Sequence, residues 1–296
     1  MTFSLGVDIG GTKIATVLMD RDGKIQNRSE VPSDPTDKEK MFEQVIKSID
    51  QILEESQTTL QEIQGVGVGV PGKIDRENGI AVFQNNLPWT NFPIVSRLQE
   101  HLSIENITLD NDVCMAAFAE WKVSNATKQD TFVYITISTG IACSVIHEGA
   151  FMRGKGFTGE IGLFPVIANG QIEALEKVAS GPGIKKLAEK RFNDPNISTA
   201  DFFSKYKEED KEATKLMLEI ADSLAHGVYS IICLLDPHKI VFGGGVMNNN
   251  PFLLELIKEA LKKYLIPEQL HSLEILYISS LKGDSGVVGA GLKGFF

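Results

Sequence analysis

The stretch "FSLGVDIGGTKIATVLMDRDG" (Phe3–Gly23) decides the fold, because a second stretch of the same plan follows it about 130 residues later, "FVYITISTGIACSVIHEG" (Phe132–Gly149). Each contains an apolar strand, a turn with threonine and glycine, a second apolar strand, and a turn made of an acidic residue and glycine. Apolar runs separated by glycine turns are typical of β-hairpins. Two such hairpins predict two related domains, as in a duplicated fold.

Strand-like and helix-like segments alternate around both hairpins. Apolar residues recur at helical spacing over about residues 38–56 and over much of 174–235. Short apolar runs predict further strands at 65–72, 107–109 and 236–246. Because strands alternate with helices, we expect an α/β fold with partly parallel sheets.

Composition bounds the class of protein. The chain has 296 residues, 43% of them hydrophobic and 23% charged, which is ordinary for a globular protein with room for two domains. The net charge of -10 argues against general nucleic-acid binding, which needs a basic face. Three scattered cysteines (Cys114, Cys143, Cys233) indicate a reducing, cytoplasmic setting. No window approaches the roughly 20 apolar residues of a membrane span, so we expect no membrane association.

Three glycine turns are candidate phosphate sites. In "DIGGTK" (Asp8–Lys13) the glycines let backbone N–H groups approach an anion, and the Thr12 hydroxyl can donate a hydrogen bond. "STG" (Ser138–Gly140) is a turn of the same type, and "FGGGV" (Phe242–Val246) stands where a strand precedes a helix, whose N-terminus attracts negative charge. Each is also explained as an ordinary turn. Together they indicate that the three close on one polyphosphate.

A carboxylate, Asp112, stands where a strand precedes a helix in "ITLDNDVCMAAFAEW" (Ile107–Trp121). Asp and Asn are favoured as helix N-caps, so the residue is explained by a structural role. Local sequence favours this capping role, but Asp112 can also act as a general base that takes the proton from an attacking hydroxyl during phosphoryl transfer. The two roles are compatible, because active sites of α/β proteins lie at strand ends.

Taken together, the motifs resemble those of the ROK family of repressors, open reading frames and sugar kinases. They keep the family's order from about Leu5 to Gly291: "LGVDIGGTKIATVLMDRDG", "GVGVPGKID", "NNLPW", "LDNDVCMAAFAEW", "ITISTGIACSVIHEG", "GEIG", "LEKVASGPG", "LDPHKIVFGGGV" and "GDSGVVGAG". The resemblance implies the duplicated actin-like ATPase (ribonuclease H-like) fold, with two α/β domains around a cleft. We expect a smaller N-terminal domain of residues 1–115, completed by 284–296, and a larger one of residues 116–283.

The resemblance also implies residue roles. Asp112 matches the catalytic base that activates a sugar hydroxyl towards the γ-phosphate of ATP. Residues implied to bind the sugar are Gly72, Asn86, Asn111, Asp112, Glu160 and Glu176. Residues implied to bind ATP are Asp8, Gly10, Gly11, Thr12 and Lys13 in the first phosphate loop, Thr139 and Gly140 in the second, and Gly243, Gly244 and Gly245 in the adenosine motif. Mg²⁺ would bridge the phosphates near Asp8. Glu160 and Glu176 can also be explained as ordinary surface acids.

The chain departs from the family's pattern in its middle. Many members have a cysteine-rich zinc site there, whereas residues 149–181 contain no Cys or His. We therefore predict no structural zinc, and we expect apolar contacts and the Asn169-Gly170 turn to hold this loop. Leu163 replaces a sugar-binding histidine, which leaves the sugar open and favours a more apolar pocket, such as one for an N-acetyl group. Ala142 stands in the second phosphate loop, where the family usually has more glycine.

We expect an ATP-dependent kinase that phosphorylates the 6-hydroxyl of a hexose or N-acetylhexosamine, with glucokinase and N-acetylmannosamine kinase as the main candidates. One alternative is a weakly active or inactive sugar- or nucleotide-binding sensor, and another is an actin-like ATPase without a sugar substrate. Because the first phosphate loop begins at Asp8, we expect no DNA-binding domain before it and therefore no self-sufficient repressor. The family resemblance predicts a homodimer.

Overall fold

The computed structural model describes residues 2–168 and 170–296 and divides into two compact units. Unit 1 contains the residues up to Ser124, together with Arg153–Phe157 and Asp284–Phe296. Unit 2 contains Asn125–Met152 and Thr158–Gly283. The sequence-based division between residues 115 and 116 stays a prediction about domains. By compactness, the whole of helix α3 (Asp112–Val123) lies in unit 1.

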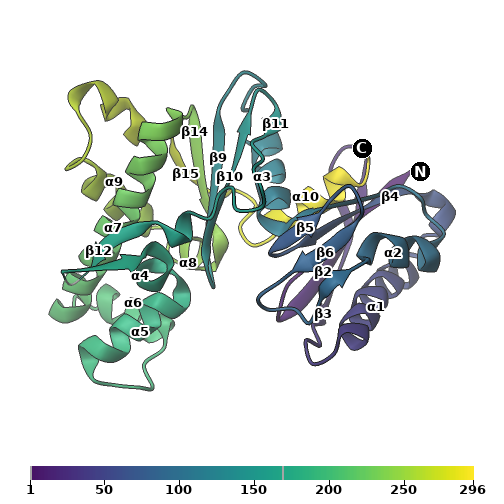
Figure 1. Cartoon of the computed structure of the whole chain (residues 1–296), viewed down its shortest axis with the longest axis horizontal. Helices are drawn as coiled ribbons and strands as arrows, with labels where there is room; N and C mark the ends of the chain where they lie inside the picture. The colour runs from purple at the N-terminus through teal and green to yellow at the C-terminus, as the bar shows by residue number, and fades with distance from the viewer. Residues whose placement is uncertain (1, 169) are drawn as a thin grey trace. The chain divides into compact units, whose positions relative to one another are not determined.

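Unit 1 is built on a five-stranded sheet in the order β3-β2-β1-β4-β8 (Figure 1). The predicted hairpin forms its antiparallel half, and the strands that follow helices pair in parallel with it. The strands are β1 (Phe3–Ile9), β2 (Lys13–Asp20), β3 (Ile25–Pro32), β4 (Ile63–Val70) and β8 (Ile107–Asn111). The predicted strands at 65–72 and 107–109 are thus confirmed within two residues at each end.

Unit 2 repeats this plan strand for strand in the order β11-β10-β9-β14-β15. The first three strands are antiparallel, and β9, β14 and β15 are parallel, as are β1, β4 and β8 in unit 1. The strands are β9 (Phe132–Ile137), β10 (Ile141–His147), β11 (Ala150–Phe151), β14 (Lys239–Gly243) and β15 (Leu276–Ile278). The duplicated α/β fold predicted from the paired hairpins is confirmed.

Helix α1 (Lys38–Ser56) covers one face of the sheet in unit 1, as its apolar spacing predicts. The Asp37 side chain caps its first turn by accepting hydrogen bonds from the backbone N–H groups of Glu39 and Lys40. The helix ends at Gln57, whose left-handed conformation is common after a last helical turn. Its apolar stripe joins the buried core of unit 1 together with helix α2 (Ile94–Leu102).

Helix α10 (Ser285–Lys293) packs on the opposite side, against the backbones of β1 and β4 and against α3 (Figure 1). Glycine makes this approach possible: a Cβ on Gly67 of β4 would lie only 1.9 Å from the carbonyl oxygen of Ala290. Likewise, a Cβ on Gly289 would lie 1.8 Å from the carbonyl oxygen of Met115. The last helix therefore completes the core of unit 1, far in sequence from the strands that it covers.

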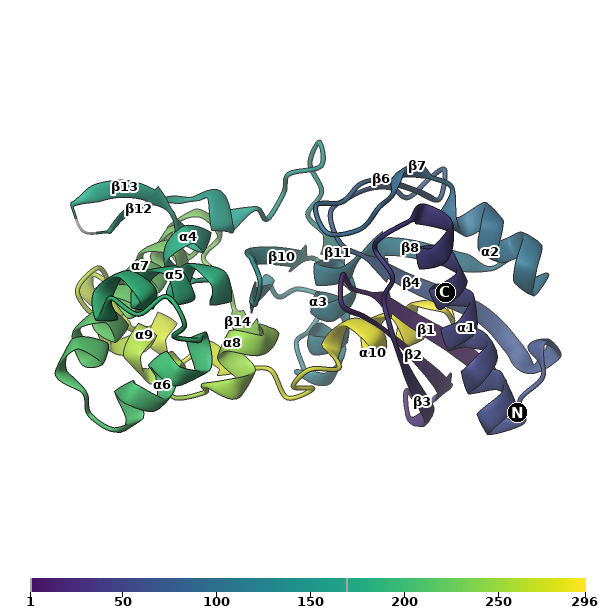
Figure 2. The same ribbon diagram turned by 90° about the horizontal axis from the view of Figure 1, so that it is seen from below.

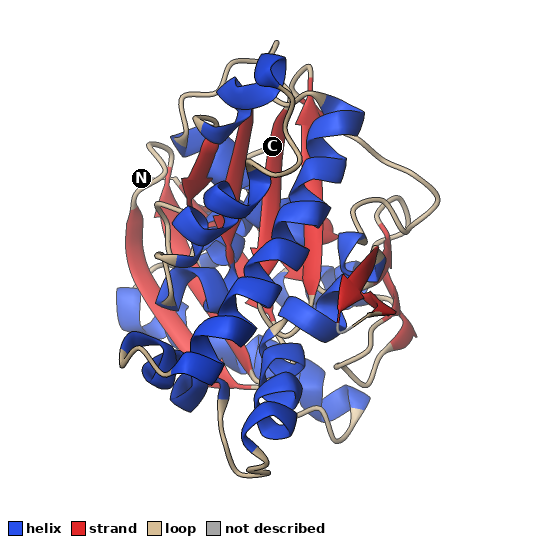
Figure 3. Cartoon of the chain, turned by 90° about the vertical axis from the view of Figure 1, so that its left-hand side faces the viewer, coloured by secondary structure: helices blue, strands red, loops and turns tan. Residues whose placement is uncertain are grey.

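Helices cover the sheet of unit 2, and Figure 3 shows helices in blue in front of red strands. Their apolar residues form one large core with the strands. They are α4 (Leu175–Ala179), α5 (Gly181–Phe192), α6 (Thr199–Lys207), α7 (Lys211–Leu235), α8 (Gly244–Asn249) and α9 (Leu253–Leu261). The helical content predicted for much of 174–235 is confirmed, with breaks between α5 and α6 and between α6 and α7.

Helix α7 corrects one expectation, because it is long and apolar enough to cross a membrane by length and composition. Half of its most apolar window is buried within unit 2, as in the core helix of a globular protein. One such helix is weak evidence for a span.

Small elements complete the two units. Unit 1 has a three-stranded sheet of β5 (Lys73–Asp75), β6 (Ile80–Phe83) and β7 (Thr90–Phe92). Unit 2 has a two-stranded ribbon of β12 (Pro165–Ala168) and β13 (Gln171–Ala174), visible in Figure 2. Val166 anchors this ribbon in the core, which agrees with the expected apolar contacts, whereas the Asn169 part of the predicted turn lies outside the described residues. The 3-10 helices are η1 (Leu60–Glu62), η2 (Ile161–Leu163) and η3 (Pro267–Leu273).

Candidate functional site

The first predicted phosphate loop is the turn between β1 and β2. The Gly10 N–H donates to the carbonyl of Lys13 at 2.9 Å, which closes the hairpin. A Cβ on Gly11 would lie 3.0 Å from both Asn86 Nδ2 and the Asn86 carbonyl oxygen, so the turn rests directly against Asn86. The structure therefore brings together the predicted phosphate loop and one predicted sugar-binding amide.

Lys13 forms an ion pair with a residue of the neighbouring strand. It is the first residue of β2, and its Nζ lies 2.8 Å from Glu30 Oε2 on the neighbouring strand β3. The hydrogen bond from Lys13, with help from Arg28, lowers the pKa of Glu30. Local sequence does not reveal this ion pair, because the partners are brought together only by strand pairing.

The strand-to-helix corner between β8 and α3 carries the predicted acceptor residues. Asn111 is the N-cap of α3, because its Oδ1 accepts the Val113 N–H at 2.9 Å. Its Nδ2 donates to the carbonyl of Gly72 at 3.0 Å, which ties the corner to the turn after β4. Asp112 is the first helical residue, and its Oδ1 also accepts the Val113 N–H, at 2.9 Å. The capping role considered for Asp112 is thus filled by Asn111.

Gly72 holds that turn in a conformation that other residues rarely adopt. Its φ is +79°, and a Cβ at this position would lie 2.4 Å from the carbonyl oxygen of Phe83. The Pro-Gly turn predicted from the sequence therefore needs glycine for two reasons, its backbone angle and its space. Because the chain reverses direction here, the carbonyl of Gly72 points towards Asn111.

Two carboxylates, Asp8 at the end of β1 and Asp112, approach each other across Gly69 of β4. A Cβ on Gly69 would lie 3.3 Å from Asp8 Oδ1 and 3.6 Å from Asp112 Cα. Burial, and then the negative charge of Asp112, raise the pKa of Asp8 to about 7, against the opposing effect of Lys13. A carboxyl group with such a raised pKa beside a second carboxylate is characteristic of functional sites.

The fit of this pair to a metal can be judged from its donors. Within residues 2–168 and 170–296, no group of three or more His, Cys, Asp or Glu side chains is arranged to hold a metal ion. Asp8 supplies hard carboxylate oxygens, and Mg²⁺ is usually held by one or two carboxylates together with phosphate oxygens and water. The residues present therefore fit Mg²⁺ that arrives with a nucleotide.

Unit 2 contains a cavity of about 570 Å³ that joins two of the predicted nucleotide motifs. Thr139, from the turn between β9 and β10, and Gly245, in the first turn of α8, both line it. A Cβ on Gly245 would meet no atom within 4 Å, so this glycine borders open space. The other lining residues are Ser138, Gly181, Pro182, Thr199, Ala200, Phe203, Ser204, Lys207, Val246, Asn249 and Asn250.

The remaining glycines of these motifs serve packing. A Cβ on Gly243 would lie 2.2 Å from Tyr134 Oη, and one on Gly244, where φ is +84°, would lie 2.4 Å from the carbonyl oxygen of Ile137. Both glycines let the turn before α8 press against β9. Only Gly245 of the three adenosine-motif glycines lines the cavity.

Glu160 and Glu176, two of the residues predicted to bind the sugar, lie close enough in unit 2 for their charges to interact. Burial, and then the charge of Glu176, raise the pKa of Glu160. Glu176 Oε2 also lies 3.5 Å from the Cβ position of Gly140, which places this acid beside the second phosphate turn. Leu163, three residues after Glu160, leaves 58% of its side chain exposed. An exposed apolar side chain near two acids agrees with a partly apolar ligand surface.

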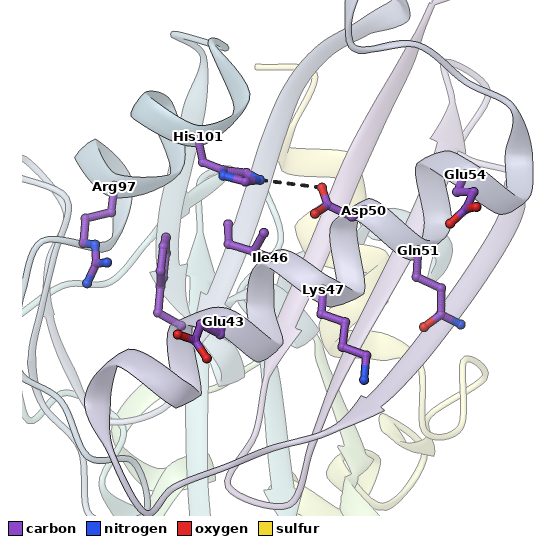
Figure 4. A pocket seen from close by; sticks show the side chains of 9 residues that line it. Glu43, Ile46, Lys47, Asp50, Gln51, Glu54, Arg97 and His101 are labelled. Carbon is purple, nitrogen blue, oxygen red and sulfur yellow. Dashed lines mark ion pairs between the residues drawn. The ribbon is translucent and has the colours of Figure 1, made fainter.

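A second cavity, of about 700 Å³, lies between α1 and α2 in unit 1 (Figure 4). His101 faces Asp50 across it at 3.6 Å between Nε2 and Oδ1. The remaining lining residues are Phe42, Glu43, Ile46, Lys47, Gln51, Glu54 and Arg97. None of the predicted site residues lines this cavity, so it is separate from the candidate site.

Sequence reasoning missed several residues around these groups. Gly69 lies in the quoted "GVGVPG" motif, but only the sheet shows that it separates Asp8 from Asp112. Gly286, whose Cβ position is 2.5 Å from Asp8 Oδ2, lies in the quoted "GDSGVVGAG" motif. Lys207 belongs to a charged segment whose composition is typical of a solvated surface, yet it lines the cavity beside Thr139. Nothing in the local sequence indicates that Lys207 lines the same cavity as Thr139.

Comparisons with known proteins agree with this arrangement. Residues 4–292 match the ROK family. The glucokinase of Thermotoga maritima is 31% identical, over 97% of this chain and 95% of that protein, and an N-acetylmannosamine kinase of Escherichia coli O6:K15:H31 is 28% identical, over 98% and 97%. A solved structure of a ROK family glucokinase from Streptomyces griseus in complex with glucose and AMPPNP has a TM-score of 0.82 at 24% identity and covers 99% of both chains.

The structural likeness confirms the expected actin-like, duplicated α/β fold. The family match extends over both hairpins, all three glycine turns and the corner that carries Asp112. This chain belongs to the ROK family.

Proposed function

We propose that this protein is an ATP-dependent sugar kinase that phosphorylates the 6-hydroxyl of a hexose or an N-acetylhexosamine, with Asp112 as the general base. The observation that carries the proposal is the pair of carboxylates in unit 1, in which Asp112 stands beside Asp8. Relatives named glucokinase and N-acetylmannosamine kinase along nearly the full chain support the reaction class.

In the proposed reaction, Asp112 accepts the proton of the sugar 6-hydroxyl as the hydroxyl oxygen attacks the γ-phosphorus of ATP. The bond between the γ-phosphorus and the oxygen shared with the β-phosphate breaks, and ADP leaves. The Val113 N–H holds Asp112 Oδ1 at 2.9 Å, which fixes the direction of the carboxylate. Asn111, held by its own contacts to Val113 and Gly72, presents an amide at the same corner. Asn86, against the Gly11 turn, supplies a second amide that can bind a sugar hydroxyl.

Nucleotide binding is proposed for the three glycine turns. The 570 Å³ cavity between Thr139 and Gly245 is large enough for a flat ring and its ribose. Backbone N–H groups of the turns would bind phosphate oxygens. Asp8 would hold Mg²⁺ that arrives with ATP, and the bound cation would supply positive charge that neutralises the phosphates. A cation bound there would lower the raised pKa of Asp8, because nearby positive charge favours the ionised carboxylate.

Sugar recognition is proposed to include the acids of unit 2. Glu160 and Glu176 can each accept hydrogen bonds from one or two hydroxyls, and a site of this kind discriminates against sugars that lack them. Leu163 cannot bind a hydroxyl, so it favours a substituent with an apolar part. This feature motivates N-acetylmannosamine beside glucose as a candidate substrate.

A second candidate is a sensor that binds sugar or nucleotide with little catalysis. Ala142 motivates it, because the family usually has more glycine in this stretch, and Ala142 lies in β10 directly after the second phosphate turn. Asp112 and a complete first loop argue for the kinase. We further propose a cytoplasmic homodimer whose partners are the sugar and ATP. The net charge of -10 supports the exclusion of nucleic acid.

The deciding experiment measures ADP release from Mg·ATP with glucose, mannose, fructose, N-acetylglucosamine and N-acetylmannosamine. We expect turnover with one or a few of these sugars, and no turnover with the 6-deoxy analogue of the best one. Asp112→Asn should lower kcat by about 10²- to 10⁴-fold, which is the usual contribution of a general base. Asp22→Asn is the matched control, because Asp22 is exposed on a turn.

Each outcome separates the two candidates. Turnover that Asp112→Asn abolishes and Asp22→Asn leaves intact supports the kinase. Equal kcat in the wild type and Asp112→Asn would remove Asp112 from the role of base. Calorimetric binding of ATP and a sugar without turnover would favour the sensor.

A further inference from the structure

A buried ion pair fastens a short segment of chain to the corner that carries Asp112. We call this segment, Arg153–Phe157, the strap. Arg153 binds the Asp110 carboxylate through both terminal nitrogens of its guanidinium group. Nη1 donates to Oδ1 at 3.0 Å, and Nη2 donates to Oδ2 at 2.5 Å. Only 6% of the Asp110 side chain is exposed. Paired, charge-assisted hydrogen bonds of this kind are strong and directional.

The strap contacts the corner on both sides of the Asn111-Asp112 pair. Before the pair, Asp110 Oδ1 accepts the Asn111 N–H at 2.8 Å as well as the Arg153 hydrogen bond. After the pair, Arg153 Nη1 lies 3.3 Å from Cys114 Sγ. One guanidinium therefore holds the residue that precedes the candidate site and a residue in the first turn of α3. This contact restrains the direction in which β8 passes into the helix.

Comparison with a neighbouring cation, Arg76, shows that the paired hydrogen bonds to Asp110 come from Arg153. Arg76 also approaches Asp110 Oδ1, but at 3.8 Å, and 44% of its side chain is exposed. At that distance it adds a Coulomb attraction without a hydrogen bond. Arg76 therefore provides a control, because it places a positive charge near Asp110 without forming a hydrogen bond.

The strap is an excursion of the chain. Residues on both sides of it belong to unit 2, whereas the strap packs within unit 1. Gly156, with φ of +109°, allows it to pass over the Lys73 side chain, whose Cε lies 3.2 Å from the Cβ position. Glu160 follows Arg153 by only seven positions in the sequence. In the sequence, the strap therefore lies between the segment that carries Asp112 and a candidate sugar-binding acid.

We propose that Arg153 is a positioning residue, which latches the strap onto Asp110 and so holds Asp112 in the orientation required for catalysis. The inference rests on the proposed role of Asp112 as general base. Small displacements of a reacting group can cost about 100-fold in rate, so a loosened corner has a measurable effect. Replacing a buried ion pair by neutral groups is often tolerated by the fold, whereas removing one partner leaves a buried charge. Comparing the loss of one partner with the loss of both therefore separates an effect on catalysis from an effect on the stability of the fold.

The test compares Arg153→Met, the double variant Asp110→Asn/Arg153→Met, and the control Arg76→Met. Arg153→Met should destabilise the protein and lower kcat about 10- to 100-fold with the KM for ATP unchanged. The double variant removes the stranded charge, so its Tm should recover while kcat stays low. Arg76→Met should leave kcat and KM close to those of the wild type. Arg153→Lys keeps the positive charge but cannot form the two parallel hydrogen bonds, so it should give an intermediate kcat.

A measurement independent of activity tests the latch itself. Hydrogen–deuterium exchange of the backbone amides in residues 153–157 should become faster in both Arg153→Met variants and remain slow in Arg76→Met. Unchanged exchange in the strap would overturn the latch. Faster exchange with full kcat in the double variant would show that the ion pair is structural only. If the wild type turns over no sugar, the proposed function fails and the positioning role fails with it, while the exchange result still decides whether the strap is latched.

Discussion

Replacing Asp8 by asparagine is expected to stabilise the protein at high pH while impairing catalysis. Asp8 has a pKa of 3.8 when unperturbed and about 7 in the folded chain, first because of burial and then because of Asp112. Between these values the folded state keeps a proton that the unfolded state has lost. Stability therefore falls as the pH rises from about 4 to about 7 and levels off above that. The asparagine side chain cannot ionise, so the Asp8→Asn variant lacks this fall.

The interval from 3.8 to about 7 corresponds to about 4 kcal/mol at roughly 1.4 kcal/mol for each pH unit. At pH 5 the penalty on the wild type is about 2 kcal/mol, and at pH 8 it is about 4 kcal/mol. The Asp8 side chain keeps some accessible surface, so these are upper values. We expect the variant to gain about 2 kcal/mol on the wild type between the two pH values.

Urea unfolding of both proteins at pH 4, 5, 7 and 8, without nucleotide or Mg²⁺, measures the effect. Asp22→Asn serves as the matched control, because Asp22 is exposed and its replacement should leave the pH dependence of the wild type unchanged. Asp112→Asn should weaken the fall by removing the second cause of the raised pKa. Parallel stability curves for the wild type and Asp8→Asn between pH 4 and pH 8 would refute the argument.

Three further substitutions test the rest of the structure. Gly67→Ala should lower the free energy of unfolding by about 3 kcal/mol or more, because its methyl group would overlap the Ala290 carbonyl; an unchanged urea midpoint would contradict the packing of α10 on β4. Gly245→Val should raise the KM for ATP without changing the Tm, since the glycine borders open space in the cavity, and an unchanged KM would place the nucleotide elsewhere. Glu176→Gln should lower the pKa of Glu160, because it removes the negative charge that raises it. The acid limb of the pH profile of kcat/KM for the sugar should therefore move to lower pH. An acid limb at unchanged pH would exclude Glu160 from sugar binding.

Much of the architecture follows from local sequence. The hairpins at Phe3–Gly23 and Phe132–Gly149 predict the antiparallel halves of both sheets, and residues 38–56 predict α1 almost to the residue. These features depend on side-chain alternation and on turns, which involve residues close together in the chain. The repeat of one plan within one sequence is enough to predict the duplicated fold.

Parts of the candidate site are also accessible from sequence, because family motifs keep residue types that chemistry requires. The motifs single out Asn111 and Asp112, Glu160 and Glu176, and Thr139 and Gly245, and the structure brings each pair together within its own unit. Their catalytic and binding roles remain predictions until the assays above are done.

Other relations exist only in the folded chain. Lys13 pairs with Glu30 because β2 and β3 align, and Asp110 meets Arg153 because the strap passes over the corner 43 positions later in the sequence. The raised pKa of Asp8 arises because Gly69 and helix α10 bring protein atoms and a second carboxylate to it. The sequence by itself determined which segments become strands, helices and glycine turns, because those choices depend on near neighbours. The tertiary structure decided which charges meet and how strongly they are shielded from water, because both depend on packing between distant segments.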